Sequence, residues 1–228
     1  MTEFVVHGIP GSPYVRSPLI ALEEKGARWR LAALPFGGHH TPEYRTRHPF
    51  EKIPAMEHGD FALYETQAML RYIDRVAPGP ALTPQDPRAA ARMDQLLNIA
   101  DAYLAPRVTN ILAFARVVAP RLGIPVDEEK VAAALPDAAH VLGVLEQLIG
   151  GAPFLAGEAL SLADGHLFAQ LGYLPEIAEG RALLVETPAL ADWIERMASR
   201  PSAVRTEWQR LADDAGMPLP PLPEPIAA

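Results

Sequence analysis

The sequence predicts a small α/β domain followed by an all-helical domain, and three observations support this prediction. Strand-like and helix-like segments alternate through residues 1–79. Residues 80–87 are rich in proline, which is typical of a stiff linker. In residues 88–214 the strand signals disappear and apolar residues recur at helical spacing. Residues 215–228 are again rich in proline, so we expect an extended or disordered tail.

The composition indicates a globular protein with a sizeable core. The chain has 228 residues, of which 49% are hydrophobic, and its mean hydropathy is +0.04. No apolar run approaches the ~20 residues that a membrane helix needs, and the N-terminus lacks a basic region followed by an apolar stretch. We therefore expect a cytoplasmic protein with no membrane partner.

Charge and cysteine content exclude several functions. The absence of cysteine excludes disulfides, thiolate metal sites and mechanisms that use a protein thiol. The net charge of -8, with no cluster of lysine and arginine, argues against nucleic acid as a partner.

The first elements are a strand and a helix. The run Glu3–His7 is short, apolar and rich in β-branched residues, which favours a strand that Gly8 ends. Ser12 followed by Pro13 predicts a helix that runs to Gly26, with Ser12 as its N-cap.

A second strand and a hairpin follow. Apolar and charged residues alternate over Arg28–Leu34, which predicts a strand, and a short helix is expected at Pro42–Arg47. The segments Ala55–Glu57 and Phe61–Tyr64 flank a turn that contains Gly59, which predicts a hairpin. Thr66 then reads as the N-cap of a helix that reaches Val76. This order implies a small mixed sheet with helices packed on it.

The pair Ile53-Pro54 precedes the hairpin. Because proline has no amide hydrogen, it belongs at a strand start or a sheet edge. In a cis bond the amide and carbonyl of Ile53 would turn outward and could pair with an extended peptide, although proline alone makes cis the minor form.

The helical domain is predicted from four periodic segments. They cover residues 88–119, 127–149, 162–178 and 189–199. Ser161 and Asp164 have the spacing of a capping box at the start of the third helix. Thr187-Pro188 opens the fourth helix as Ser12-Pro13 opens the first.

Two stretches resemble the cytosolic glutathione S-transferase family. The first matches the family's glutathione-binding segment at Pro49, Lys52, Ile53, Pro54, Gly59, Asp60, Glu65 and Thr66. It differs at three positions, with His48 for asparagine, Glu51 for glycine and Thr66 for serine, and only Glu51 bears on the loop geometry. The second stretch, residues 10–17, resembles the serine-type members, in which the active serine lies four residues before an arginine.

The resemblance implies the glutathione transferase fold, with a thioredoxin-like domain ahead of the helical bundle. It further implies a cis bond before Pro54, glutathione as cosubstrate, a small and mostly apolar electrophile, and a homodimer. The missing cysteine argues against the thiol-transferase and dehydroascorbate-reductase branches. A carrier or ligand-binding protein of the same fold, or a dimerising interaction module, is the alternative.

Ser12 is the candidate catalytic residue. Its hydroxyl at a helix N-terminus could stabilise the thiolate of glutathione, whose pKa otherwise lies near ~8.5. From the residues alone, an ordinary cap is the better explanation of Ser12; the resemblance reverses this and favours the catalytic role. Tyr14 is the rival, and Arg16 is expected to pair with an acid and stabilise the fold.

The resemblance also suggests binding residues for glutathione. Glu65 and Thr66 could hold its γ-glutamyl end, while Lys52, His39 and His40 could neutralise its glycyl carboxylate. Each of these side chains also suits a solvated loop.

The second substrate is expected between the domains. Tyr14, Tyr103, Val108, Ile111 and Phe114 could line its site, although residues at helical spacing more often belong to a core than to a pocket. His39, His40 and His48 lack the pattern of a zinc site, so no metal is expected. No role is expected for His166, and Gly165 replaces the apolar residue that usually follows the capping-box aspartate, which predicts a weaker helix start.

Overall fold

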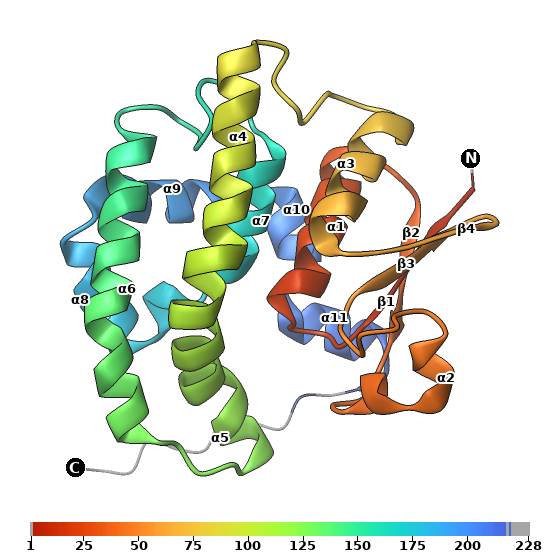
Figure 1. Cartoon of the computed structure of the whole chain (residues 1–228), viewed down its shortest axis with the longest axis horizontal. Coiled ribbons are helices and arrows are strands. Elements are labelled where there is room, and N and C mark those ends of the chain that lie inside the picture. Colours follow the sequence, from red (N-terminus) through yellow and green to blue (C-terminus); the bar gives the residue numbers. More distant parts are fainter. Residues whose placement is uncertain (1, 218, 220–228) are drawn as a thin grey trace.

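The computed structural model describes residues 2–217 and 219, and its two parts are visible in Figure 1. The N-terminal part is an α/β domain with elements at β1 Phe4–Gly8, α1 Pro13–Glu24, β2 Trp29–Ala33, η1 Gly38–His40, α2 Pro42–Arg45, β3 Ala55–His58, β4 Phe61–Tyr64 and α3 Thr66–Val76. The strand order is β2-β1-β3-β4, with β1 parallel to β2 and the other two pairs antiparallel. The predicted mixed sheet is confirmed.

The second part is helical. Its elements are α4 Pro87–Ile99, η2 Ala100–Val118, α5 Ala119–Leu122, α6 Glu128–Ile149, α7 Leu162–Leu171, η3 Leu174–Glu176, α8 Ala178–Val185, α9 Pro188–Ala198, α10 Pro201–Arg205 and α11 Trp208–Asp214. None of the helices in the described part of the chain has the length and apolar character needed to cross a bilayer.

The helices α5, α8, α10 and α11 of this part were not predicted individually. The expected helix over residues 162–178 ends at Leu171, because Gly172 and Pro175 follow it and neither favours continuation of the helix. The chain instead forms η3, which contains Pro175, and then the separate helix α8. Helices α10 and α11 span only five and seven residues, too few for a clear periodic pattern.

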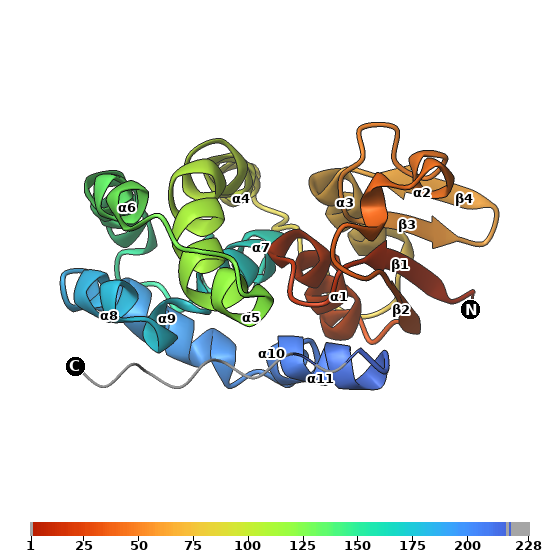
Figure 2. The ribbon, with the colours of Figure 1, turned by 90° about the horizontal axis from the view of Figure 1, so that it is seen from below.

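Helix α1 is the element that joins the two parts. It packs on β1 and α3 within the α/β domain and on α7 and α10 of the helical domain. Figure 2 shows α10 and α11 lying along the α/β domain on the side of α1. The side chains of α1 at the contact with α7 include Ser17, Ile20 and Ala21, all of which are buried.

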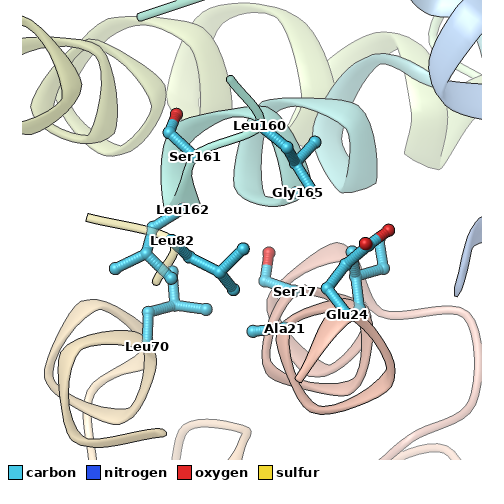
Figure 3. Close-up of a pocket in the computed structure, with 10 residues that line it drawn as sticks. Ser17, Ala21, Glu24, Leu70, Leu82, Leu160, Ser161, Leu162 and Gly165 are labelled. Carbon is cyan, nitrogen blue, oxygen red and sulfur yellow. The ribbon is translucent and has the colours of Figure 1, made fainter. Parts of the chain in front are cut away.

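The contact between α1 and α7 explains Gly165. A Cβ atom at this position would lie 3.0 Å from Cγ2 of Ile20, so a larger side chain would push the helices apart. Figure 3 shows α7 above α1 at this contact, with Gly165 opposite Ser17 and Ala21. The packing leaves a void of about 10 Å³, room for roughly one water. The weaker helix start stays a prediction, but close packing accounts for the glycine.

The segment between the domains is fixed by a buried ion pair. Nζ of Lys25 lies 3.1 Å from Oδ1 of Asp74 and also donates to the carbonyl of Pro80. The Asp74 carboxylate accepts hydrogen bonds from the amides of Leu82 and Thr83. Burial raises the pKa of Asp74, but these amides and Lys25 outweigh it and hold the pKa below its usual value.

The tail falls largely outside the described residues. Helix α11 ends at Asp214. Residues 218 and 220–228, which include most of the predicted proline-rich tail, are not part of the described structure.

Candidate active site

A cavity of about 510 Å³ opens between the two domains. One wall comes from the α/β domain and includes the loop before α1, the start of α1, His39 and Ile53. The opposite wall comes from η2, α5, the residues after α7 and the start of α11. This volume lies within the range of small-molecule binding sites.

Ser12 lies at the start of α1, on the wall of the cavity that the α/β domain contributes. Its backbone is extended, with φ -66° and ψ 125°, and its carbonyl accepts from the amides of Val15 and Arg16. Within residues 2–217 and 219, the Ser12 hydroxyl makes no capping hydrogen bond to its helix. An ordinary cap would accept a hydrogen bond from a backbone amide of the first turn, and Ser12 does not, so its hydroxyl remains available to a ligand.

The loop before Ser12 is held by a residue from the far end of the chain. Gly11 adopts φ +86°, and the ring atoms of Trp208 lie within 2.5 Å of the place where a Cβ would stand. Only glycine therefore fits beneath this ring. The guanidinium of Arg121 lies 4.8 Å from the centre of the same ring, on the side of α5.

The Ile53-Pro54 bond is cis, as the resemblance implied. Neither the amide nor the carbonyl of Ile53 takes part in a backbone hydrogen bond among the residues that the structure describes. Ile53 lies just before β3 and lines the cavity.

Basic side chains gather next to Ile53. Burial lowers the pKa of His39, and the nearby positive charges of His40 and Lys52 lower it further. Burial also lowers the pKa of His48; the charge of Glu65 partly offsets this, and the charge of Lys52 lowers the pKa further. The ring centres of His39 and His40 lie 3.9 Å apart, and of the predicted binding residues only His39 and Ile53 line the cavity itself.

Helix α3 begins beside the first turn of α1. The hydroxyl of Thr66 donates to the carbonyl of Tyr14 over 3.3 Å. Thr66 was predicted to be the N-cap of α3, but it is the first residue of the helix. Glu65, with φ 72°, takes the cap position. The shift by one residue occurs because Glu65 provides the turn itself, and it leaves the Glu65 side chain exposed.

The loop at Glu51 keeps the conformation that favours glycine. Glu51 has φ 53°, and its carboxylate accepts a 2.8 Å hydrogen bond from Nε of Arg45. A non-glycine residue pays about 1–2 kcal/mol for this backbone region. The replacement of glycine therefore affects stability here rather than the path of the loop.

Comparison with known proteins identifies the family. The family models described as glutathione S-transferase N-terminal domain and glutathione S-transferase C-terminal domain match residues 6–81 and 109–201. The chain is 32% identical to glutathione S-transferase 4 of Zea mays, over 87% of this chain and 89% of that protein. It is 30% identical to glutathione S-transferase 3 of Zea mays over the full length of both. The chain belongs to the glutathione S-transferase family.

A solved glutathione S-transferase confirms the fold. Glutathione S-transferase I from maize, in complex with an atrazine glutathione conjugate, superposes with a TM-score of 0.78 at 27% identity, covering 89% of this chain and 95% of that one. The N-terminal domain with its four-stranded mixed sheet and the helical domain after it are the glutathione transferase fold.

Of the residues expected at the second-substrate site, only one lines this cavity. Phe114 lines the cavity, but Tyr14, Tyr103, Val108 and Ile111 do not belong to its walls. Val108 is fully buried in the helical core, and the Tyr103 side chain is exposed to solvent. Tyr14 lies with its phenol among Asp101 and Gln170, where burial and the Asp101 charge raise its pKa.

The winding of η2 explains this difference. The amide of Ala119 donates to the carbonyl of Phe114, five residues earlier, so this stretch is wider than an α-helix. The residues that line the cavity from η2 and α5 are Thr109, Asn110, Ala113, Phe114, Val117, Val118 and Arg121. They recur every four residues, whereas the prediction assumed ordinary helical spacing.

A buried polar network beside the cavity was also missed. His166 is fully buried, and its ring nitrogens lie 2.8 Å from Oγ of Ser17 and 3.0 Å from Oδ1 of Asp101. Nε2 of Gln67 donates to the same aspartate over 2.6 Å. The network joins α1, α3, η2 and α7, and no local pattern in the sequence signals it because its members are far apart.

Among residues 2–217 and 219, no group of three or more histidine, aspartate or glutamate side chains is placed to hold a metal ion.

Proposed function

We propose that this protein conjugates glutathione to small, mostly apolar electrophiles, with Ser12 stabilising the thiolate. The observation that carries the proposal is the uncapped Ser12 hydroxyl on the wall of a 510 Å³ cavity between the domains. The maize relative holds an atrazine glutathione conjugate, which supports the same class of reaction here.

The chemistry requires a thiolate at neutral pH. A free thiol titrates near ~8.5, and lowering this pKa by about two units takes roughly 2.7 kcal/mol. A charge-assisted hydrogen bond from Ser12 and the positive end of α1 supply stabilisation of this size together. The thiolate sulfur then attacks the electrophilic carbon. With an aryl halide, a carbon–sulfur bond forms, the carbon–halogen bond breaks, and halide leaves.

We assign the tripeptide to the α/β side of the cavity. Its backbone would pair with the open amide and carbonyl of Ile53, and its γ-glutamyl end would lie at the start of α3, near Glu65 and Thr66. The cluster of Lys52, His39 and His40 would neutralise its glycyl carboxylate.

The electrophile is assigned to the helical side. Phe114, Ala113, Val117 and Val118 offer apolar contact there, and Phe36 faces the same cavity from the α/β domain. This wall suits a flat or compact apolar group.

The test compares the parent protein with Ser12→Ala, using 1-chloro-2,4-dinitrobenzene as electrophile. We expect kcat to fall about 10²-fold or more, as for loss of one donor to a reacting anion, while the glutathione Kd changes little. Ser161→Ala, at another helix start, is the matched control and should retain its kcat. If parent and Ser12→Ala both bind glutathione but neither turns over, the carrier alternative is correct.

A homodimer is proposed as well. Exposed aromatic side chains gather at the open edge of the sheet, where Phe50, Phe61 and Tyr64 are 67%, 44% and 36% accessible. The Phe50 and His48 rings both pack near Tyr64. Sedimentation should give twice the chain mass of 24.7 kDa, and Phe50→Ser should lower it. A parent mass near 24.7 kDa would contradict the dimer. The cytoplasmic location stays a prediction from the sequence.

A further inference from the structure

Arg16 is a half-buried cation on the wall of the cavity, and none of the described residues gives it the expected acidic partner. Within the described residues, no carboxylate lies within ion-pair distance of its guanidinium. Nη2 donates to the carbonyl of Ala203 over 3.0 Å, and Nε lies 3.5 Å from Oγ1 of Thr206. The guanidinium also stacks over Phe168, 5.0 Å from the ring centre. The sequence-based interpretation of Arg16 as one half of an ion pair is therefore wrong.

Arg200 provides an internal comparison. It also ties α1 to the α10 region, but through two 2.7 Å hydrogen bonds to the carboxylate of Glu24. An arginine can therefore connect these two segments while its charge is paired with a carboxylate. Arg16 connects the same segments without a carboxylate partner. Connecting the segments therefore does not explain why Arg16 keeps an unpaired positive charge.

The position of Arg16 relative to Ser12 offers that explanation. Residues four apart share one face of a helix, with Cβ atoms about 5–6 Å apart. Ser12 and Arg16 stand in this relation at the start of α1, and both line the cavity. Nη1 of Arg16 makes no hydrogen bond to any described residue, while the other two nitrogens are held by α10 and Thr206.

The electrostatic surroundings keep Arg16 charged. Burial lowers its pKa to about 10, and the charges of Glu207 and Glu176 partly oppose this. Both glutamates line the cavity and are exposed to water, which screens them. The other charged or titratable side chains on the walls are His39, Arg121 and Tyr173, and burial raises the pKa of the Tyr173 phenol. At neutral pH, Arg16 is thus a charged and partly desolvated side chain, which an anion bound in the cavity would stabilise.

We propose that the guanidinium of Arg16 acts with the Ser12 hydroxyl to stabilise the thiolate of glutathione. The inference rests on the proposed conjugation function and adds a second group to it. The hydroxyl donates a hydrogen bond to the sulfur, and the guanidinium lowers the free energy of the negative charge beside it.

The test is the pKa of the bound thiol, measured from the ultraviolet absorbance of the thiolate and from the pH profile of kcat/KM with 1-chloro-2,4-dinitrobenzene. In Arg16→Gln, which removes the charge, the thiol pKa should rise by about one unit or more relative to the parent. Arg16→Lys keeps the charge but cannot form both hydrogen bonds, and should recover most of that shift. Arg16→Met, which can still pack on Phe168, takes the place of Arg16→Gln if the latter does not fold.

Arg200→Gln is the matched control, since it removes the other arginine that ties α1 to the α10 region. It should lower Tm and leave the thiol pKa unchanged. The inference is overturned if Arg16→Gln keeps the parent's thiol pKa, if Arg16→Lys shifts it as far as Arg16→Gln, or if Arg200→Gln shifts it equally. If the parent itself does not lower the pKa of bound glutathione, both this inference and the proposed function fail. If the parent lowers the pKa of bound glutathione and the Arg16 variants lower it equally, the inference about Arg16 fails and the proposed function remains valid.

Discussion

Two helices of this protein begin with a serine, and the two serines are used in opposite ways. Ser161 starts α7 within a capping box, and the Asp164 carboxylate accepts from both its amide and its hydroxyl. Ser12 starts α1 without any capping hydrogen bond in the described structure. Ser161 is 2% exposed in the junction between helices, whereas Ser12 lies on the wall of the cavity.

The difference shows that a helix start can serve stability or chemistry. At α7 the Ser161 amide and hydroxyl both donate to Asp164, and the amide of Leu162 donates to the carbonyl of Leu82, so these groups are already paired inside the protein. At α1 the following proline already favours the helical backbone and has no amide to cap, so the hydroxyl is free without loss of the helix. The predictions below test this contrast.

The largest loss of stability is expected at the start of α7, where the capping box pairs the polar groups of Ser161. In Asp164→Ala, the amides of Leu155 and Ser161 and Nε1 of Trp193 lose their acceptor in a fully buried site. The free energy of unfolding should fall by about 3–5 kcal/mol, measured by urea denaturation. Asp164→Asn retains one acceptor and should lose less. A loss below 1 kcal/mol for Asp164→Ala would break the contrast, because the capping box would then contribute no more than an exposed cap.

The Lys25–Asp74 ion pair at the C-terminal end of α1 should contribute strongly to the free energy of unfolding. Asp74→Asn leaves the buried Lys25 ammonium without its charged partner, and we expect a loss of about 3 kcal/mol at pH 7. The double variant Lys25→Met with Asp74→Asn removes both charges and should be less destabilised than Asp74→Asn.

The stability lost in Asp74→Asn should depend on pH in a defined way. The folded-state pKa of Asp74 is below its usual value, so its contribution is complete above about pH 4 and is lost as pH falls through the folded pKa. The difference in unfolding free energy between parent and Asp74→Asn should therefore be constant from pH 8 to 5 and shrink below about pH 4. A constant difference down to pH 2 would contradict this role.

The two serines themselves should differ in stability by a smaller amount. Ser161→Ala should cost about 1 kcal/mol, the usual value of a lost cap, while Ser12→Ala should cost less than about 0.5 kcal/mol. Both are measured as shifts in the urea midpoint at unchanged m-value. Equal costs would mean that Ser12 also acts as a cap in solution.

The smallest effect concerns the turn before Ile53. Glu51→Gly should raise the free energy of unfolding by about 0.5 kcal/mol, because glycine adopts φ 53° without the side-chain clash, and the gain exceeds the loss of the exposed Arg45 contact. Glu51→Ala loses the contact and keeps the clash, so it should give no gain. Destabilisation by Glu51→Gly would show that the Arg45 contact holds this loop.

Much of the α/β side could be predicted because its signals are local. The strand lengths, the hairpin around Gly59 and the Ser12-Pro13 start each depend on a few adjacent residues, and the structure confirms these elements. The prediction of Thr66 as N-cap was wrong by one residue because Glu65 adopts positive φ, which glutamate rarely does.

The helical wall of the cavity could not be predicted in the same way. Its residues come from η2, α5, the turn after α7 and α11, and their meeting depends on tertiary packing. The wide winding of η2 changed which residues share a face, so Phe114 was identified and Asn110 and Val117 were not. Trp208 and Arg16 gain their roles only through contacts with segments more than 80 residues away along the chain.

The most direct test of the account is a titration of glutathione bound to the parent, to Ser12→Ala and to Ser161→Ala. The account predicts that the parent binds the thiol with a pKa about two units below that of free glutathione, and that Ser161→Ala matches it. Ser12→Ala should move the pKa back toward the free value by about one unit or more. An unchanged thiol pKa in Ser12→Ala would contradict the assignment of the thiolate to the start of α1.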